Sequence, residues 1–568
     1  MGISYNSYNN MQNSQRQIIA NFIAVSTALY GAYLIGFRLL IAGLFHLHLR
    51  SSELTGVLLS QADLIFGLSL LYLSVMLGRR KQNAWRVAVV TYGIIFILHM
   101  PLLMQWFGIL LHPILAFHII FPFLMLIGLW LARQDFTARS DIATFKSSIL
   151  VSALVMMAAF VYGVSGFLLL DAKDFHQEVS FTSAATNTMD QFALLLHDPL
   201  EPKTRRAHLF EDSLSLISAG AVAYAVISFF APMRARFSAN NHEREHFKEL
   251  LIANDVPSED FFKLWPHDKQ YFFDDSGQSG LAYRVQKGVA LVAGDPVGST
   301  VGPLLTNFTE ICHHNDWSPA FIHVDDRWRK QYEKQGYKLQ RIGQEAVLDI
   351  AHYQEHVRRN KYFRNIINRF NKAGYQAKLL APPHSKATLA ALRSVSDEWL
   401  AKPGRAERGF VMGYFTDDYM QQCRIWAAYD DAGQMQGFLN LLPSDDFDNV
   451  EATYDFLRQR QSSLPNTNDF LLTSLLEWLP AQGYQRLNLG LSPLAGLAGD
   501  RDADTVIDNI LKLAYQNGDR FYSFSGLHRF KDKYEPAWSD RYVAYRGSLA
   551  NYVRVMRALL QAMKSTKQ

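Results

Sequence analysis

The stretch VEATYDFLRQR, residues 450–460, places one carboxylate and two guanidinium groups at the end of a strand-like pattern. Apolar and mostly polar side chains alternate along its first eight residues, which is the period-two signature of a half-buried strand. Asp455 and Arg458 lie three residues apart, so they would face opposite sides of a regular strand. Both can meet one ligand only if the chain turns at 456–457. The competing interpretation is an ordinary surface ion pair between Asp455 and Arg458 or Arg460.

A second concentration of charge, at 356–396, is wholly basic. It contains no aspartate or glutamate and nine basic residues, namely Arg358, Arg359, Lys361, Arg364, Arg369, Lys372, Lys378, Lys386 and Arg393. Within it, YFRNIINRFNKAG has an apolar stripe at helical spacing and a glycine that favours a helix end. We therefore predict a helix near 357–373 with a basic face. Such a face is typical of a site for phosphate, from RNA or anionic lipid, although a merely solvated face has the same composition.

No cofactor or metal site is predicted from the motifs. GDPVG at 294–298 resembles a phosphate-binding corner but lacks the lysine and spacing of a P-loop. The sequence has no acetyl-CoA loop of the Q/R-x-x-G-x-G/A kind where an acetyltransferase would need one. The histidines, including His313 and His314, lack metal-ligand spacing, and we assign them no role. Cys312 and Cys423 fit a reducing compartment and indicate neither a disulfide framework nor a metal site.

The elements that must position these groups fall into two unlike halves. Up to Met233 the chain has 14 basic and 12 acidic residues, clumped between long uncharged runs. Because a bilayer-spanning helix needs about 20 apolar residues, we predict an α-helical transmembrane domain over 1–236. Its six or so helices are expected at roughly 18–37, 54–77, 86–105, 108–131, 147–170 and 213–232. The first is expected to be retained, since it does not have the pattern of a cleaved signal peptide.

The distribution of charge in the loops predicts the orientation. Basic residues cluster after the second, fourth and sixth expected helices, whereas the loop 171–212 holds eight acids against four bases. By the positive-inside tendency, the N-terminus and everything after 233 are cytoplasmic. We therefore predict a multi-pass protein of the inner (cytoplasmic) cell membrane with a cytoplasmic C-terminal domain.

From residue 240 onward the composition is that of a soluble α/β protein with helices packed on a mostly antiparallel sheet. Two passes of strands and helices in similar order indicate tandem GNAT-like acyltransferase folds, an inference from element order alone. We place the first GNAT-like subdomain at 237–355 and the second at 356–548. The second begins with the basic linking helix at 356–374, and the basic C-terminal tail, 549–568, suits a membrane surface.

Seven motifs in the second half follow the order seen in a known family: GDPVG, FRNIINRFNKAGY, GYF, YDFLRQR, NDFLLTSLLEW, GYQRLNLGLSPL and FKDKYEPAWSDRYVAY. Over roughly 240–548 the chain resembles the synthase domain of the aminoacyl-phosphatidylglycerol synthases, the lysyl-phosphatidylglycerol synthase or multiple peptide resistance factor family. The membrane half resembles that family in character only. Full-length members have further spans that form a flippase block, so this chain resembles a short form without it.

The resemblance implies transfer of an amino acid from aminoacyl-tRNA to the headgroup hydroxyl of phosphatidylglycerol at the cytoplasmic membrane face. The product would lower the negative charge of the membrane and give resistance to cationic antimicrobial peptides. No cofactor is implied, because the ester is already activated and ester exchange is nearly balanced in energy. The implied partners are aminoacyl-tRNA, phosphatidylglycerol and the lipid bilayer, and a homo-oligomer is left open.

The family's motifs also imply roles for single residues. Asp455, Arg458 and Lys531 are implied to be catalytic, although the family's acid-to-arginine motif has other residues in place of Phe456 and Leu457. Asp455 would bind the α-ammonium group of the amino acid or polarise the attacking hydroxyl. Arg458 would face the ester carbonyl or a phosphate, and Lys531 would be a second cation. The residues implied to bind substrate are Arg364, Asn365, Asn368, Arg369, Asp469, Asn488 and Gly490.

Two other functions stay open on sequence grounds. The first is a tRNA- or acyl-CoA-dependent transferase that acts on another membrane lipid or on a cell-wall precursor. The missing acetyl-CoA loop argues against the CoA-dependent variant. The second is a non-enzymatic lipid transporter whose cytoplasmic domain only regulates, and the series of motifs argues against it. The sequence does not predict which amino acid is transferred.

Overall fold

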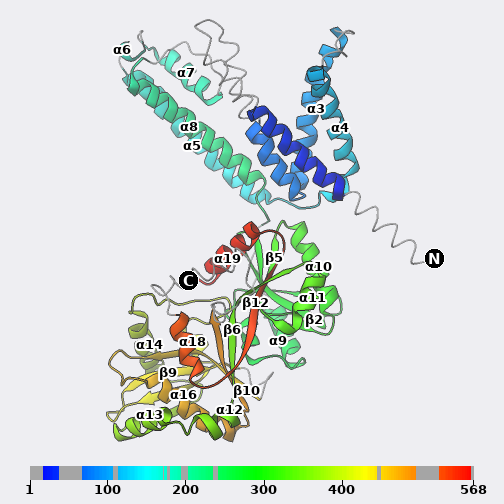
Figure 1. Ribbon diagram of the computed structural model, residues 1–568. Coiled ribbons are helices and arrows are strands. Elements are labelled where there is room, and N and C mark those ends of the chain that lie inside the picture. The colour runs from blue at the N-terminus through cyan, green and yellow to red at the C-terminus, as the bar shows by residue number, and fades with distance from the viewer. Residues whose placement is uncertain are drawn as a thin grey trace, which may run out of the picture. The chain divides into compact units, whose positions relative to one another are not determined.

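The computed structural model describes residues 17–36, 67–105, 113–170, 172–175, 179–193, 203–233, 241–443, 450–493 and 524–564 (Figure 1). The chain forms two compact units. The first comprises Met1–Arg234 with His313–Asp316, and the second comprises Ala235–Cys312 with Trp317–Gln568. The expected boundary at 236/237 lies close to this division.

The first unit is helical. Its longer labelled helices are α3 (Gln82–Gln105), α4 (Pro113–Leu131), α5 (Ile142–Leu169) and α8 (Arg205–Phe229), with the shorter α6 (Ala172–Phe175) and α7 (Phe181–Ala193). Among the described residues, three helices are long and apolar enough to cross a membrane: Gln17–Gly36, Thr144–Leu169 and Arg205–Phe229. Gly67–Gly78 and Ile119–Leu131 are apolar but shorter. The membrane character is therefore supported, and the number of six spans stays a prediction.

Small residues let helices of this unit approach closely. A Cβ atom added at Gly31 would lie 2.7 Å from the backbone oxygen of Gly67, and one added at Gly67 would lie 2.9 Å from that of Gly31. Without a hydrophobic driving force in lipid, such close contacts between helix backbones are a main source of helix association. A larger side chain at either position would force these two helices apart.

The second unit is built on one 12-stranded sheet. The strand order is β1-β2-β3-β5-β12-β6-β11-β10-β9-β8-β7, and β4 pairs with β2. The strands are β1 (Gln270–Phe273), β2 (Ser279–Gln286), β3 (Val289–Ala293), β4 (Val297–Gly298), β5 (Ser318–Asp325), β6 (Lys338–Asp349), β7 (Gln376–Leu380), β8 (Arg424–Tyr429), β9 (Met435–Leu441), β10 (Glu451–Gln459), β11 (Arg486–Pro493) and β12 (Ala537–Tyr545).

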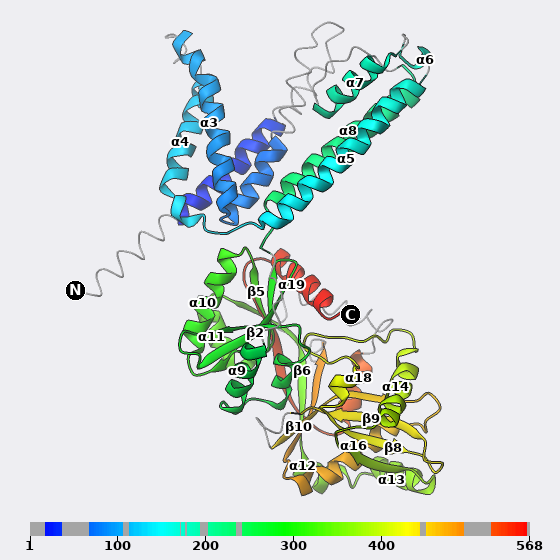
Figure 2. The ribbon, with the colours of Figure 1, turned by 180° about the vertical axis from the view of Figure 1, so that it is seen from behind.

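The helices of the second unit include the expected basic helix. They are α9 (Asn241–Ile252), α10 (Val301–His314), α11 (Arg329–Lys334), α12 (Ile350–His352), α13 (Lys361–Lys372), α14 (Lys386–Leu400), α15 (Asp417–Met420), α16 (Thr467–Trp478), α18 (Phe524–Asp532) and α19 (Leu549–Ala562). The basic helix is α13, which buries Phe363, Ile366 and Phe370 as its apolar stripe predicts. It packs beside α16, which covers strands β8 to β10 (Figure 2).

The last strand lies far from its neighbours in sequence. β12 is inserted between β5 and β6, antiparallel to both, with Val543 opposite Ile322 on one side and Gln340 on the other. The two expected subdomains therefore share one sheet, and the second contributes a strand to the part of the sheet formed by the first. Element order along the chain does not reveal this exchange, because a strand's partners are set by long-range contacts.

Only two neighbouring strand pairs are parallel in the described sheet, β3 with β5 and β10 with β11. The ladder between β10 and β11 runs only from Glu451 opposite Arg486 to Thr453 opposite Asn488. Beyond it, both strands are irregular: β10 shifts register against β9, and β11 shifts register against β6. Such bulges bend a strand and re-aim its side chains. Asp455 and Arg458 lie at or beside the first bulge, and Asn488 and Gly490 lie at the second.

Candidate active site

A cavity of about 970 Å³ lies within the second unit where the ladder between β10 and β11 stops. It is lined by residues of β5, β10, β11, β12 and α18, by the 3-10 helix η3 (Ser258–Lys263) and by the loop 403–413. The charged or titratable side chains most relevant to chemistry in this lining are Glu259, His323, Glu407, Asp455, Arg458, Lys531 and Arg541. All three residues expected to be catalytic therefore line one cavity.

A bulge, rather than the expected turn, brings Asp455 and Arg458 to the same cavity. Strand β10 continues to Gln459, so a turn at 456–457 is wrong. Its pairing with β9 passes from Tyr454↔Leu441 to Leu457↔Leu439, which inserts one extra residue into β10. The extra residue reverses the alternation, so two side chains three residues apart can face the same side.

Asn440 on β9 stabilises this bulge. The backbone N–H of Phe456, which a bulge withdraws from regular pairing, donates to Asn440 Oδ1 at 2.7 Å. Asn440 is fully buried, and its amide group also contacts Cys423 Sγ at 3.5 Å. An unpaired buried backbone N–H is costly, so this side chain offsets the cost of the irregular strand.

The carboxylate of Asp455 is fixed by two donors that both bind the same oxygen. Oδ2 accepts from the backbone N–H of Gly413 at 3.0 Å and from the Tyr419 hydroxyl at 2.9 Å. Tyr419 is itself held by stacking on Trp265, with ring centroids 5.1 Å apart. Burial raises the pKa of Asp455 to about 6, against the opposing effects of the Tyr419 hydrogen bond and the Arg458 charge. A group with this pKa can exist in either protonation state near neutral pH.

Arg458 forms its ion pair with Glu407. Its Nη1 and Nη2 atoms lie 2.9 and 3.0 Å from the two carboxylate oxygens of Glu407, and Nη1 also donates to Ser396 Oγ. The guanidinium packs over the Phe456 ring, 3.9 Å from its centroid. Arg458 is 4% exposed, so the interpretation of Arg458 as part of a surface ion pair is wrong. Its actual partner, Glu407, was not predicted from the sequence.

Lys531, Gly490 and Asn488 lie together at the bulge of β11. Lys531 Nζ donates to the backbone oxygens of Gly490 and Leu491 at 2.8 and 2.9 Å. Gly490 has a φ of +79°, a conformation that favours glycine, and its N–H donates to Asn488 Oδ1 at 2.7 Å. Burial lowers the pKa of Lys531 to about 7, although the nearby carboxylates of Glu345 and Glu259 oppose this effect.

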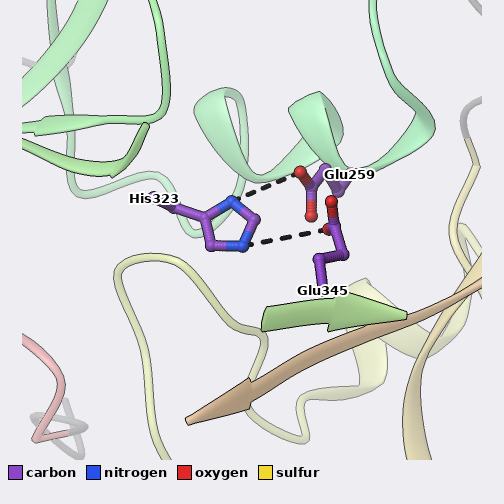
Figure 3. Close-up of side chains that lie close together, drawn as sticks. All are labelled: Glu259, His323 and Glu345. Atoms are coloured by element: carbon purple, nitrogen blue, oxygen red, sulfur yellow. Dashed lines mark ion pairs between the residues drawn. The ribbon is translucent and has the colours of Figure 1, made fainter. Parts of the chain in front are cut away.

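Glu259, His323, Glu345 and Arg541 form a second polar cluster, which was not predicted from the sequence. Three of these side chains meet as Figure 3 shows: His323 Nδ1 lies 3.3 Å from Glu259 Oε1, and His323 Nε2 lies 3.8 Å from Glu345 Oε1. His323 has a φ of +72° at a register shift between β5 and β12. Burial lowers the pKa of His323, but the Glu259 and Glu345 charges outweigh it and raise this pKa overall.

The donor set of this cluster favours an ion-pair network over a metal site. One ligand atom from each of Glu259, His323 and Glu345 lies within 4.8 Å of the others. Glu345, however, already pairs with Arg541 Nη2 and accepts from Asn488 Nδ2 at 3.1 Å. A cation would have to displace these donors and a protonated imidazole. Asn488, which was expected to bind substrate, contacts Glu345 and Gly490 and is not among the residues that line the cavity.

Besides Asn488, five further residues expected to bind substrate lie outside the lining of this cavity. Arg364, Asn365, Asn368 and Arg369 are on the exposed side of α13. Arg369 binds the backbone oxygen of Pro465 and Asn466 Oδ1. Asp469 is buried, accepts from the hydroxyls of Tyr362 and Tyr534 and pairs with Lys533. Asp469 therefore ties α16 to α13 and to the end of α18.

Comparison with known proteins places this region in a family. Residues 252–545 match the family model described as phosphatidylglycerol lysyltransferase, C-terminal. A phosphatidylglycerol lysyltransferase of Staphylococcus haemolyticus (strain JCSC1435) is 28% identical over 301 residues, which cover 52% of this chain and 35% of the relative. The Bacillus subtilis (strain 168) protein of the same name is 30% identical over 281 residues, covering 49% and 32%. The chain thus spans about a third of the length of these curated relatives.

Two solved structures share the fold of the second unit. The structure of L-PGS from Bacillus licheniformis has a TM-score of 0.50 and 25% identity, covering 58% of this chain and 98% of that chain. The C-terminal domain (DUF2156) of a putative lysylphosphatidylglycerol synthetase from Agrobacterium fabrum has the same TM-score, 23% identity and the same coverage. The suspected relationship is therefore confirmed: the chain belongs to the phosphatidylglycerol lysyltransferase C-terminal family.

Proposed function

We propose that the protein transfers an amino acid from aminoacyl-tRNA to a headgroup hydroxyl of phosphatidylglycerol. The observation that carries this proposal is the cavity in which Asp455 and Lys531 occur together, inside the part of the chain that matches the family model. Asp455 comes from the bulged strand β10. Lys531 comes from helix α18, which packs on the neighbouring bulged strand β11. The names of the relatives support phosphatidylglycerol as the lipid acceptor, and the basic helix α13 supports tRNA as the donor.

The reaction exchanges one ester for another. The lipid hydroxyl attacks the ester carbonyl of the aminoacyl-tRNA, a new C–O bond forms, and the bond to the tRNA ribose oxygen breaks. The proton of the attacking hydroxyl ends on that ribose oxygen, so no proton or cofactor is consumed. The enzyme therefore supplies positioning and stabilisation of the tetrahedral oxyanion.

Asp455 and Lys531 have complementary roles in this scheme. Ionised Asp455, with Oδ2 held by Gly413 and Tyr419, binds the α-ammonium group or polarises the attacking hydroxyl. Lys531 has three ammonium protons, of which two donate to Gly490 and Leu491. The third is available to the oxyanion. Arg458 acts through Glu407, whose carboxylate also lines the cavity.

The tandem GNAT-like arrangement is part of the same proposal. The parallel pair β3 with β5 is followed by a register shift at His323, and the parallel pair β10 with β11 is followed by the bulge at Asp455. Both residues are titratable and line the cavity. This repetition supports a duplicated acyltransferase unit. We also propose that the lipid product reduces the negative charge of the membrane and so protects against cationic antimicrobial peptides.

The function is tested by incubating the purified chain with tRNA charged with a labelled amino acid and with vesicles containing phosphatidylglycerol. We expect label in the chloroform-extractable lipid, and mass spectrometry of that lipid identifies the amino acid and the acceptor. Vesicles of phosphatidylcholine alone are the control, because their headgroup has no hydroxyl. Absence of labelled lipid with every charged tRNA would refute the proposal.

The basic helix gives a prediction about tRNA binding. Arg364→Glu combined with Lys372→Glu reverses two exposed charges on α13 and leaves its buried face intact. We expect weaker tRNA binding and a salt dependence flatter by about one log-log unit per lost phosphate contact. Filter binding across a salt series measures both. Arg369 is unsuitable for this test, because it also holds the loop at Pro465.

Lys386→Glu is the matched control, since Lys386 is exposed at the start of a different helix, α14. It should leave tRNA affinity nearly unchanged. If the double variant of α13 keeps its tRNA affinity but loses lipid binding, the helix belongs to the membrane surface instead.

The proposed orientation in the inner membrane gives a second prediction. Thr182→Cys places a thiol on α7, in the loop that charge assigns to the outside. We expect it to react with an impermeant thiol reagent added to intact cells. The two native cysteines, Cys312 and Cys423, are buried and give little background. Ala432→Cys, on the exposed hairpin between β8 and β9, should react only after lysis. Labelling of position 182 only after lysis would contradict the orientation.

A further inference from the structure

Helix α19 has a second face that the other described parts of the chain leave exposed. Its inner face, with Tyr552, Val555 and Leu559, is buried in a core cluster that includes residues of β3. On the outer side, Leu549, Val553 and Leu560 are 39%, 40% and 58% exposed. Their spacing of four and seven residues places them along one stripe of the helix.

The outer stripe of α19 combines apolar and basic side chains. Arg557 falls on the same stripe and is exposed, and the exposed Lys564 lies two residues after the end of the helix. No acidic residue follows Asp540 in the sequence. A helix with an apolar stripe and only basic charge is complementary to an anionic bilayer, where apolar side chains enter the headgroup boundary and the basic groups meet lipid phosphates.

A second copy of the chain fits this surface less well. A symmetric contact centred on the stripe would bring Arg557 of one copy close to Arg557 of the other. Like charges brought together without an acidic partner oppose such a contact. The chain also carries three helices long and apolar enough to cross a membrane, so a bilayer is the surface most readily available to it.

The C-terminal end of α19 is connected to the cavity. The backbone N–H of Gly409 donates to the Met563 oxygen at 2.9 Å, and Arg408 forms a β-bridge with Lys564. Met563 lines the cavity, as do Met412 and Gly413 of the loop that α19 holds. Gly413 in turn donates to the carboxylate of Asp455. A short path of contacts therefore leads from the outer stripe to the proposed reaction centre.

We propose that the outer stripe of α19 lies on the anionic surface of the bilayer and that the lipid acceptor enters the cavity past Met563 and the 408–413 loop. The inference of a membrane contact depends only on the surface of α19, whereas the inference that the acceptor enters here rests on the proposed transfer reaction. This contact would place the rim of the cavity at the depth of the lipid headgroups.

The contact is tested with the full chain in vesicles of phosphatidylglycerol and phosphatidylcholine. Leu560→Cys is labelled with a nitrobenzoxadiazole fluorophore, which emits at shorter wavelength in an apolar environment, and the buried Cys312 and Cys423 leave position 560 as the accessible thiol. We expect blue-shifted emission and quenching by lipids that carry a nitroxide near the headgroup. Ala432→Cys, labelled in the same way, is the matched control and should show neither effect.

Charge reversal tests the anionic part of the proposal. Adding Arg557→Glu and Lys564→Glu to the labelled chain should reduce the lipid quenching at position 560 and raise the apparent KM for vesicle phosphatidylglycerol severalfold, with kcat at saturating lipid unchanged. Quenching at 560 no stronger than at 432 would overturn the inference. So would a blue shift without lipid quenching, which would show a protein partner such as a second copy. Quenching needs no transfer, so a chain that is quenched but transfers nothing supports the contact and refutes the proposed function instead.

Discussion

Replacing Asp455 with asparagine is expected to lower aminoacyl transfer about a hundredfold while leaving the fold and tRNA binding intact. Asparagine can keep its side-chain oxygen where Gly413 and Tyr419 donate to Oδ2, so the local structure persists. It then turns an NH₂ group, instead of a carboxylate oxygen, towards the substrate. The charge that holds an ammonium group or accepts a hydroxyl proton is lost, and such a group contributes typically about a hundredfold or more.

The measurement is label transferred from charged tRNA to extractable lipid, compared at equal protein and saturating substrates. Arg460→Ala is the control on the same strand. Arg460 pairs with Glu398 at 2.8 Å and is not among the residues lining the cavity, so only a small loss is expected. If the Asp455 variant transfers label within a few-fold of the parent rate, the active site lies elsewhere in the protein. Arg458→Ala should also reduce transfer, because it leaves the Glu407 carboxylate at the cavity unpaired, and for the same reason it is a less specific test.

Lys531→Met should reduce transfer by a similar factor, because a good oxyanion donor contributes roughly 3 kcal/mol. Methionine fills most of the same space without a charge. Its control is Lys533→Met, two residues along the chain: Lys533 pairs with Asp469, outside the cavity lining, and its loss should change transfer only a few-fold. Equal effects of the two substitutions would mean that Lys531 matters only for stability.

The pH profile of transfer gives an independent readout of both Asp455 and Lys531. Since the pKa of Asp455 is raised to about 6, activity that needs its carboxylate should rise as pH passes through about 6. Since the pKa of Lys531 is lowered to about 7, activity that needs its cation should fall as pH passes through about 7. The parent should therefore show a bell-shaped profile. Lys531→Arg keeps its charge at high pH and should extend the alkaline limb, whereas an unchanged limb would exclude Lys531 as its cause.

The cavity residues that could be predicted were those that lie in motifs resembling a known family. Asp455, Arg458 and Gly490 were identified in this way and line the cavity, although their partners in space lie far away in the sequence. Lys531 was found through the motif around it. The bulge that lets Asp455 and Arg458 share one side was not predictable, because it depends on Asn440 of another strand.

The second polar cluster illustrates the limit of local patterns. Glu259, His323 and Glu345 come from three separate elements, and none has a spacing typical of a site. One weak signal was available: His323 is a polar residue inside the otherwise apolar stretch AFIHV. Conversely, Asp469 and Arg369 carry charges in family-like motifs, yet the structure gives them contacts to the backbone and side chains of α13, α16 and their loops. Residue type alone therefore does not distinguish a charged residue of the cavity from one that connects helices and loops.

The position of β12 has a consequence for how the chain acquires its structure. During synthesis, β5 and β6 emerge some two hundred residues before the strand that must fill the space between them. Until then each presents an unpaired edge, which is a template for aggregation and for wrong pairing. β12 also carries Arg541, the partner of Asp325 and Glu345, so the polar end of the cavity forms only when it docks. Because contacts of such long sequence separation form slowly, a nascent chain would require shielding by chaperones. A chain truncated before 537 would stay inactive even though it contains Asp455, Arg458 and Lys531.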